Sequence, residues 1–126
     1  MSISILDTPL NRALKTGLDV AALNQRLIAD NIANVDTPGY KGLRLNFDDY
    51  FKQAKSAVAG EKYNAVNPYS FIFRNDSTTM RHDGNNIDPE REMVELTQNA
   101  LNYAALTELV NRRGGYLRMV VTEGRG

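Results

Sequence analysis

Apolar residues in the first third of the chain recur at alternating steps of four and three residues. The series runs Leu14, Leu18, Ala21, Gln25, Ile28, Ile32 and Val35, and Gln25 is its one polar member. A seven-residue repeat of this kind is typical of a helix that buries one narrow stripe against another helix. We therefore predict a helix over residues 10–35, about 39 Å long, that needs a partner helix. An ordinary amphipathic helix in a small bundle has the same spacing, so that alternative stays open at this point.

A second stripe of the same period lies near the other end of the chain. It runs Met93, Leu96, Ala100, Tyr103, Thr107 and Val110. Asp88 suits the N-cap and Pro89 the first turn of its helix. Leu117 and Val121 keep the repeat beyond the glycine pair at 114–115. We predict that the helix runs through the glycines, that close approach of another backbone is their use, and that residues 122–126 fray.

Together the two stripes predict a mainly α fold in which long terminal helices form an antiparallel, coiled-coil-like pair. Residues 1–41 and 88–126 would then make one discontinuous domain. Residues 42–87 are predicted to be a flexible, partly irregular insertion, because so long a polar stretch is unusual inside a compact domain. A helical hairpin of this length leaves apolar flanks exposed unless copies pack side by side, which favours self-assembly.

The insertion contains signals for short elements. Apolar residues from Phe47 to Val58 step by three and four, which predicts a short helix over 46–58. Residues 69–74 read YSFIFR and predict either a short strand or a segment that orders only against a partner. Phe71, Ile72 and Phe73 are therefore candidates for contact with another subunit. Residues 74–86 are polar and predict a loop.

Composition excludes several classes of function. Acidic and basic residues balance at 15 each, and without a basic field nucleic acid is not an expected partner. The chain has no cysteine, which excludes disulfides and thiolate chemistry. No apolar run approaches the roughly 20 residues of a membrane span, and no cleavable signal peptide is visible. We expect neither direct membrane insertion nor a cleaved leader.

Nothing in the sequence predicts an enzyme. We find no nucleophile–base pair, phosphate-binding loop or metal-ligand spacing. The single histidine, His82, lies among loop residues and is interpreted as solvated. The carboxylates at 48–49 and 90–95 suit the first turns of helices, where the dipole favours negative charge. We expect no catalytic residue, no cofactor and no metal.

The stretch at residues 31–41, NIANVDTPGYK, ends the first helix. Asn31 and Asn34 lie three residues apart and share a helix face, where their amides can bond to the C-terminal helix or to an adjacent subunit. Pro38 and Gly39 fit the two central positions of a type II turn. We predict that this turn sends the chain outward and that Tyr40 packs its ring back.

This string resembles the signature of the flagellar rod and hook family of axial proteins, which reads approximately N-[IL]-A-N, two variable residues, then T-P-G-Y-[KR]. The matching positions are Asn31, Ile32, Ala33, Asn34, Thr37, Pro38, Gly39, Tyr40 and Lys41. Residues 86–113 are similar to the second family element. They depart from the Q-R-A-Y-E-A-N version of distal rod and hook proteins, since this chain has QNALNYAAL at 98–106. With DGNN at 83–86 and the short length, the chain is most similar to members from the proximal rod.

The resemblance implies a structural subunit of the proximal rod of the bacterial flagellar basal body. Such subunits leave the cytoplasm through a flagellum-specific export channel without a cleaved signal, and they assemble into a helical tube through the periplasm that transmits torque. The implied partners are copies of the chain, adjacent rod subunits, the rod-to-ring adaptor and, in transit, the export gate.

We expect one set of residues to hold the helix pair and its neighbours, and we call it the assembly seam. It comprises Leu14, Leu18, Ala21, Ile28, Ile32, Met93, Leu96, Ala100, Tyr103 and Val110. Two alternatives remain. Another rod subunit of the same family would keep the mechanism and change the position along the rod. A soluble helical adaptor or secretion chaperone would belong to a different class and would be a stable dimer in solution.

Overall fold

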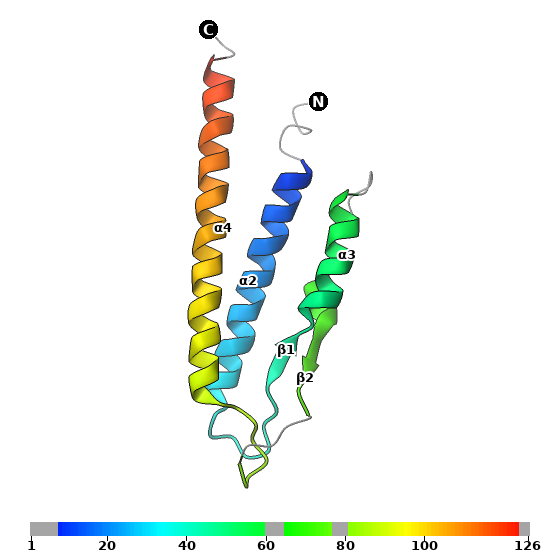
Figure 1. Cartoon of the computed structure of the whole chain (residues 1–126), viewed down its shortest axis with the longest axis vertical. Helices are drawn as coiled ribbons and strands as arrows, with labels where there is room; N and C mark the ends of the chain where they lie inside the picture. Colours follow the sequence, from blue (N-terminus) through cyan, green and yellow to red (C-terminus); the bar gives the residue numbers. More distant parts are fainter. Residues whose placement is uncertain (1–7, 60–64, 77–80, 124–126) are drawn as a thin grey trace.

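The computed structural model describes residues 8–59, 65–76 and 81–123. Two long helices, α2 (Pro9–Ala33) and α4 (Pro89–Glu123), lie side by side in antiparallel directions (Figure 1). Between them in the chain come β1 (Leu43–Leu45), α3 (Phe47–Ala59), the 3-10 helix η1 (Pro68–Phe71) and β2 (Ile72–Arg74). The prediction of a mainly α fold with paired terminal helices is confirmed. The division into one discontinuous domain and a flexible insertion stays a prediction.

Local hydrogen bonds explain where α2 begins and ends. The hydroxyl of Thr8 accepts from the amide of Asn11 at 3.1 Å, and Pro9 takes the first helical position, where its missing N–H costs nothing. At the other end the amide of Asn34 donates to the carbonyl of Asp30 at 3.1 Å. The observed helix therefore starts one residue earlier and ends two residues earlier than the helix predicted over residues 10–35.

The helix α4 also begins as its sequence indicates. The Asp88 carboxylate accepts from the amide of Glu90 at 3.1 Å, and the helix continues without a break through the glycine pair at 114–115. A Cβ built on either glycine would meet nothing within 4 Å, so the chain itself does not provide the expected close backbone approach. Thr122 and Glu123 are helical, which corrects the prediction that they fray. Residues 124–126 lie outside the described residues.

The middle of the chain is built around a small antiparallel strand pair. Leu43 pairs with Arg74, and Leu45 with Ile72. The predicted strand over 69–74 is in fact η1 followed by the three residues of β2. The strand β1 was not predicted, because three residues are too few to show an alternating pattern. The helix α3 matches the predicted range of 46–58 to within one residue.

The apolar core lies between α2 and these middle elements, not between α2 and α4. Its buried members are Val20, Leu23, Leu27, Leu45, Tyr50 and Ala54. Phe71 packs edge-on against Tyr50 with ring centroids 5.6 Å apart, and Ile72 also packs on this cluster. Both residues thus contribute to the chain's own core, whereas Phe73 is largely exposed. Of the three predicted partner contacts, Phe73 is the one that stays available at the surface.

Candidate functional site

Asn31 is fully buried and forms the centre of a hydrogen-bonding cluster at the end of α2. Its side-chain amide donates to the carbonyl of Leu43 at 3.0 Å and to the carboxylate of Glu92 at 3.3 Å. Its side-chain oxygen accepts from the amide of Leu43 at 2.8 Å and from the Tyr40 hydroxyl at 3.5 Å. One asparagine therefore joins α2, the start of β1, the turn and α4.

Glu92 is the only charged residue that is fully buried among those the structure describes. The Arg44 guanidinium pairs with both of its carboxylate oxygens, and it also reaches Glu95 at 3.1 Å. Burial lowers the pKa of Arg44, but the hydrogen bond to Glu92 and the charges of Glu92 and Glu95 outweigh it, so that the pKa is raised. The guanidinium thus stays charged, and the buried carboxylate has a permanent counter-ion.

A second buried asparagine, Asn85, bonds to the turn that follows α2. Its side-chain amide donates to the carbonyls of Asn34, Val35 and Thr37 at 2.9, 3.1 and 2.8 Å. Its side-chain oxygen accepts from the amide of Ile87 at 2.8 Å. A side chain of the loop before α4 thus ties down the turn that follows α2.

The turn after α2 and the loop before α4 cross at two glycines. The amide of Tyr40 donates to the carbonyl of Thr37 at 3.2 Å, and Gly39 has φ +74°, as the predicted type II turn requires. Gly84 has φ +82°, and a Cβ built on it would lie 3.5 Å from the Cα of Gly39. The amide of Gly39 donates to the carbonyl of Asp83 at 2.8 Å. The two segments are therefore interlocked backbone to backbone.

Neighbouring side chains complete this interlock. The amide of Gly42 donates to the side-chain oxygen of Asn86 at 2.8 Å, and the ammonium of Lys41 donates to the carbonyl of Gly84. The guanidinium of Arg74 lies over the ring of Tyr40, 5.6 Å from its centroid. The structure thus brings Asn31, Asn34 and residues 37–41 together with residues 83–87, far away in the sequence.

The contact between α2 and α4 is a ladder of layers seven residues apart on α4. Glu92 bonds to Asn31, and Asn99 bonds to Asn24, Gln25 and the carbonyl of Ala21. Leu106 packs on Gly17. Arg113 bonds to Asn11 and Thr8. Three of the four layers are polar. Polar groups inside a helix pair fix its register, because any slip leaves them unpaired.

The one apolar layer predicts the effect of filling Gly17. A Cβ built there would lie 3.2 Å from a methyl carbon of Leu106, so Leu106 would have to shift to admit a side chain. We expect Gly17→Leu to lower the free energy of unfolding by about 1–3 kcal/mol through overpacking, measured by urea denaturation. Gly115→Leu is the matched control, since a Cβ there meets nothing within 4 Å. Equal stabilities of the two variants would contradict the packing of Leu106 on Gly17.

The predicted assembly seam falls partly on this ladder and partly beside it. On α2, Ala21 and Ile28 are buried, and Leu14, Leu18 and Ile32 are half-buried. On α4, Leu96 is half-buried, whereas Ala100, Tyr103, Val110 and Met93 are exposed, the last at 52%. Within the single chain, α4 buries Glu92 and Asn99, one position before Met93 and Ala100. The role of the seam in assembly stays a prediction.

Sequence reasoning missed Arg44, Glu92, Asn85, Asn86 and Asn99 because they are polar and the search for a stripe counted apolar residues. A signal was present. Polar residues recur at 92, 99 and 113, and others lie at 11, 24 and 31. Matched polar positions at multiples of about seven on two helices predict polar layers in a helix pair.

Much of the outer surface of α4 is apolar. Leu101 is 66% and Val94 is 60% exposed, and Leu109, Tyr116 and Met119 are also exposed. No group of acidic, histidine or cysteine side chains in the described ranges could hold a metal ion. No helix in those ranges is both long and apolar enough to cross a membrane. Buried polar groups that satisfy one another, together with an exposed apolar helix, suit docking of another chain.

Comparison with known proteins gives consistent matches. The family described as "Flagella basal body rod protein" matches residues 12–41, which cover most of α2 and the turn after it. The flagellar basal body rod protein FlgB of Bacillus subtilis (strain 168) is 37% identical over 120 residues, covering 89% of this chain and 92% of the relative. FlgB of Borreliella burgdorferi is 31% identical over 110 residues, covering 73% and 80%. FlgB of Escherichia coli K12 is 28% identical over 113 residues, covering 78% and 81%.

Proposed function

The chain belongs to the flagellar basal body rod protein family, in which its relatives are FlgB proteins, and from this premise we propose that it is a subunit of the proximal rod that assembles into a helical, torque-transmitting tube. The proposed partners are copies of itself, adjacent rod subunits and the rod-to-ring adaptor, with the export gate as a transient partner. The proposed location is the part of the rod that spans the periplasm, reached by export from the cytoplasm without a cleaved signal peptide.

The distribution of polar and apolar residues on α4 carries this proposal. The helix is 35 residues long, yet the two residues that it buries, Glu92 and Asn99, are both polar. Apolar side chains such as Val94 and Leu101 remain in water. Monomeric proteins rarely leave a large apolar patch exposed, and such patches mark surfaces that another chain covers. A tube built from side-by-side helices provides that cover.

The interlocked end of the molecule supports a mechanical role. The turn at 37–40, the start of β1 and the loop at 83–87 are tied to one another and to both long helices by buried and part-buried hydrogen bonds. Hydrogen bonds of this kind between side chains and backbone rigidify the structure around them. A subunit that transmits torque needs this stiffness where its helices meet.

A double substitution on the outer face of α4 tests the proposal. We expect Val94→Asp/Leu101→Asp to prevent incorporation into rods, because it places charges where neighbouring subunits would bury apolar area. The unfolding free energy of the isolated chain should change by no more than about 0.5 kcal/mol, as both residues are exposed. The measurement is the content of basal bodies purified from cells that carry the variant as their only copy. Asn111→Asp, an exposed polar position on the same helix, is the control. Normal rods from the double variant would refute the proposal.

Hydrogen exchange on the purified chain at low concentration separates a rod subunit from an adaptor or chaperone. We expect rapid exchange across α4, because local stability follows the number of buried apolar contacts and this helix has few. Protection should rise when the protein assembles. Slow exchange in both α2 and α4, with a dimer that does not depend on concentration, would favour the adaptor or chaperone instead.

A further inference from the structure

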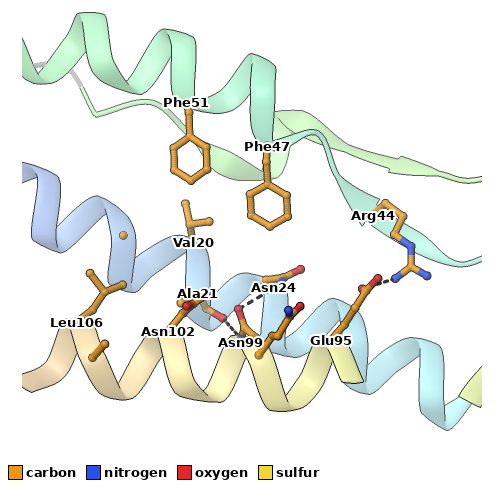
Figure 2. A pocket seen from close by; sticks show the side chains of 13 residues that line it. Val20, Ala21, Asn24, Arg44, Phe47, Phe51, Glu95, Asn99, Asn102 and Leu106 are labelled. Carbon is orange, nitrogen blue, oxygen red and sulfur yellow. Dashed lines mark hydrogen bonds and ion pairs between the residues drawn. The ribbon is translucent and has the colours of Figure 1, made fainter. Parts of the chain in front are cut away.

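A groove of about 750 Å³ opens between α3 and α4, with α2 as its floor (Figure 2). Phe47 and Phe51 extend from α3 over the groove, with their ring centroids 5.9 Å apart. Val20 lies on the floor, and Leu106 extends from α4. The aromatic rings are only partly covered, because α3 packs on α2 and not closely on α4.

The walls of the groove carry no unpaired charge. Arg44 and Glu95 at one end bond to each other at 3.1 Å, and the other polar wall residues, such as Gln98 and Asn102, are uncharged. An occupant must therefore present an uncharged, mainly apolar face. A helix does so with residues spaced i, i+3 and i+4.

The last part of α4 has such a face, and none of the described helices lies beside that face. Because Arg113 bonds to Asn11 and to Thr8, the N-cap of α2, residues 114–123 extend about 15 Å past the start of α2. We call these residues the overhang. Tyr116, Met119 and Val120 share one side of it, at i, i+3 and i+4, and all are exposed, Tyr116 at 60%. Its arginine, Arg118, lies two residues from Tyr116 and from Val120 and therefore points to the opposite side.

An overhang cannot reach the groove of its own chain. The groove is lined by residues 95–106 of the same continuous helix, and a straight helix cannot fold back on itself. We propose that the overhang of a second copy lies in the groove, with Tyr116 and Val120 against Phe47, Phe51 and the side chains of α4. This inference rests on the proposed function and identifies the surfaces that would meet. The two surfaces differ, so the contact is head-to-tail and leaves a free groove and a free overhang at the ends, as an open-ended filament requires.

Site-directed disulfide cross-linking tests the contact, and the chain has no cysteine of its own. One sample carries Asn102→Cys on the groove wall, and a second, tagged to a different mass, carries Val120→Cys. They are mixed and oxidised at a concentration at which the unmodified chain forms sedimentable assemblies. We expect a mixed dimer in about tenfold excess over the pair Asn111→Cys and Val120→Cys, because docking raises the effective concentration of the two thiols. Asn111 lies on α4 and does not line the groove.

A substitution in the groove provides an independent readout. Phe51→Asp should raise the concentration needed for assembly by about tenfold or more, as loss of a central interface side chain does, while the circular dichroism of the chain stays unchanged. Equal cross-linking of Asn102→Cys and Asn111→Cys, or normal assembly of a folded Phe51→Asp variant, would overturn the groove contact and leave self-assembly standing. Failure of the unmodified chain to assemble at any concentration would overturn the proposed function and this inference together.

Discussion

Replacing Arg44 with methionine is expected to lower the free energy of unfolding by about 3–5 kcal/mol, the usual cost of removing one partner of a buried ion pair. The carboxylate of Glu92 has no exposed surface, and without the guanidinium its remaining bond in the structure is to the amide of Asn31. Glu95 keeps its other partner, Arg91, at 3.1 Å, so the loss falls on Glu92. The measurement is the midpoint of urea unfolding, followed by circular dichroism.

Two further variants isolate the cause. Arg91→Met removes an exposed pair from the same carboxylate cluster and should cost less than about 1 kcal/mol. Adding Glu92→Gln to Arg44→Met removes the buried charge and should recover much of the loss. An unchanged midpoint for Arg44→Met, or no recovery in the double variant, would show that the pair does not stabilise the fold in this way.

The pH dependence of this stabilisation follows from the raised pKa of Arg44. A group whose pKa is higher in the folded state contributes stability at every pH below its unfolded pKa, and that contribution is lost as the pH rises through the folded value. The arginine contribution is therefore complete at neutral pH. Around neutral pH, titration of Arg44 therefore adds no pH dependence to the difference in unfolding free energy between the parent protein and the methionine variant.

Patterns that depend on neighbouring residues predicted structure well. Asp88 with Pro89 marked the start of the second long helix, since capping uses side chains within a turn of the amides they serve. The pair Pro38–Gly39 identified its turn, since Gly39 has the positive φ that a type II turn needs. These signals are local, so the sequence alone contains them.

Contacts between distant residues were not predictable in the same way. Asn85 stands in a polar segment interpreted as a loop, and nothing nearby indicates that it will bind carbonyls some 50 residues earlier in the chain. Glu92 was interpreted as a residue of the first, solvated turn of a helix, yet it is buried because Arg44 of β1 reaches it. Both outcomes depend on which segments meet in space. A search for apolar stripes therefore gives the helices but not the polar residues that fix their register.

Asn85 also gives the second large prediction, because its side chain serves four buried or part-buried backbone groups at once. Asn85→Ala leaves the carbonyls of Asn34, Val35 and Thr37 and the amide of Ile87 without this partner. The three carbonyls keep a second donor, from the amides of Thr37 and Tyr40 and from the guanidinium of Arg81. The variant therefore loses four hydrogen bonds, each worth about 0.5–1.5 kcal/mol. Since water can reach part of the site, we expect a total loss of about 3 kcal/mol in the free energy of unfolding, together with faster hydrogen exchange across residues 34–42.

The choice of substitute distinguishes the bonding from the shape of the side chain. Asn85→Asp keeps the size but replaces the donating amide with an oxygen that faces three carbonyls, so we expect it to destabilise the chain at least as much as alanine does. Asn111→Ala, at an exposed helical position, should change stability by less than about 0.5 kcal/mol. If aspartate were tolerated at 85, the three carbonyl bonds would contribute little. The interlock would then depend on the close approach of Gly39 and Gly84 rather than on the Asn85 side chain.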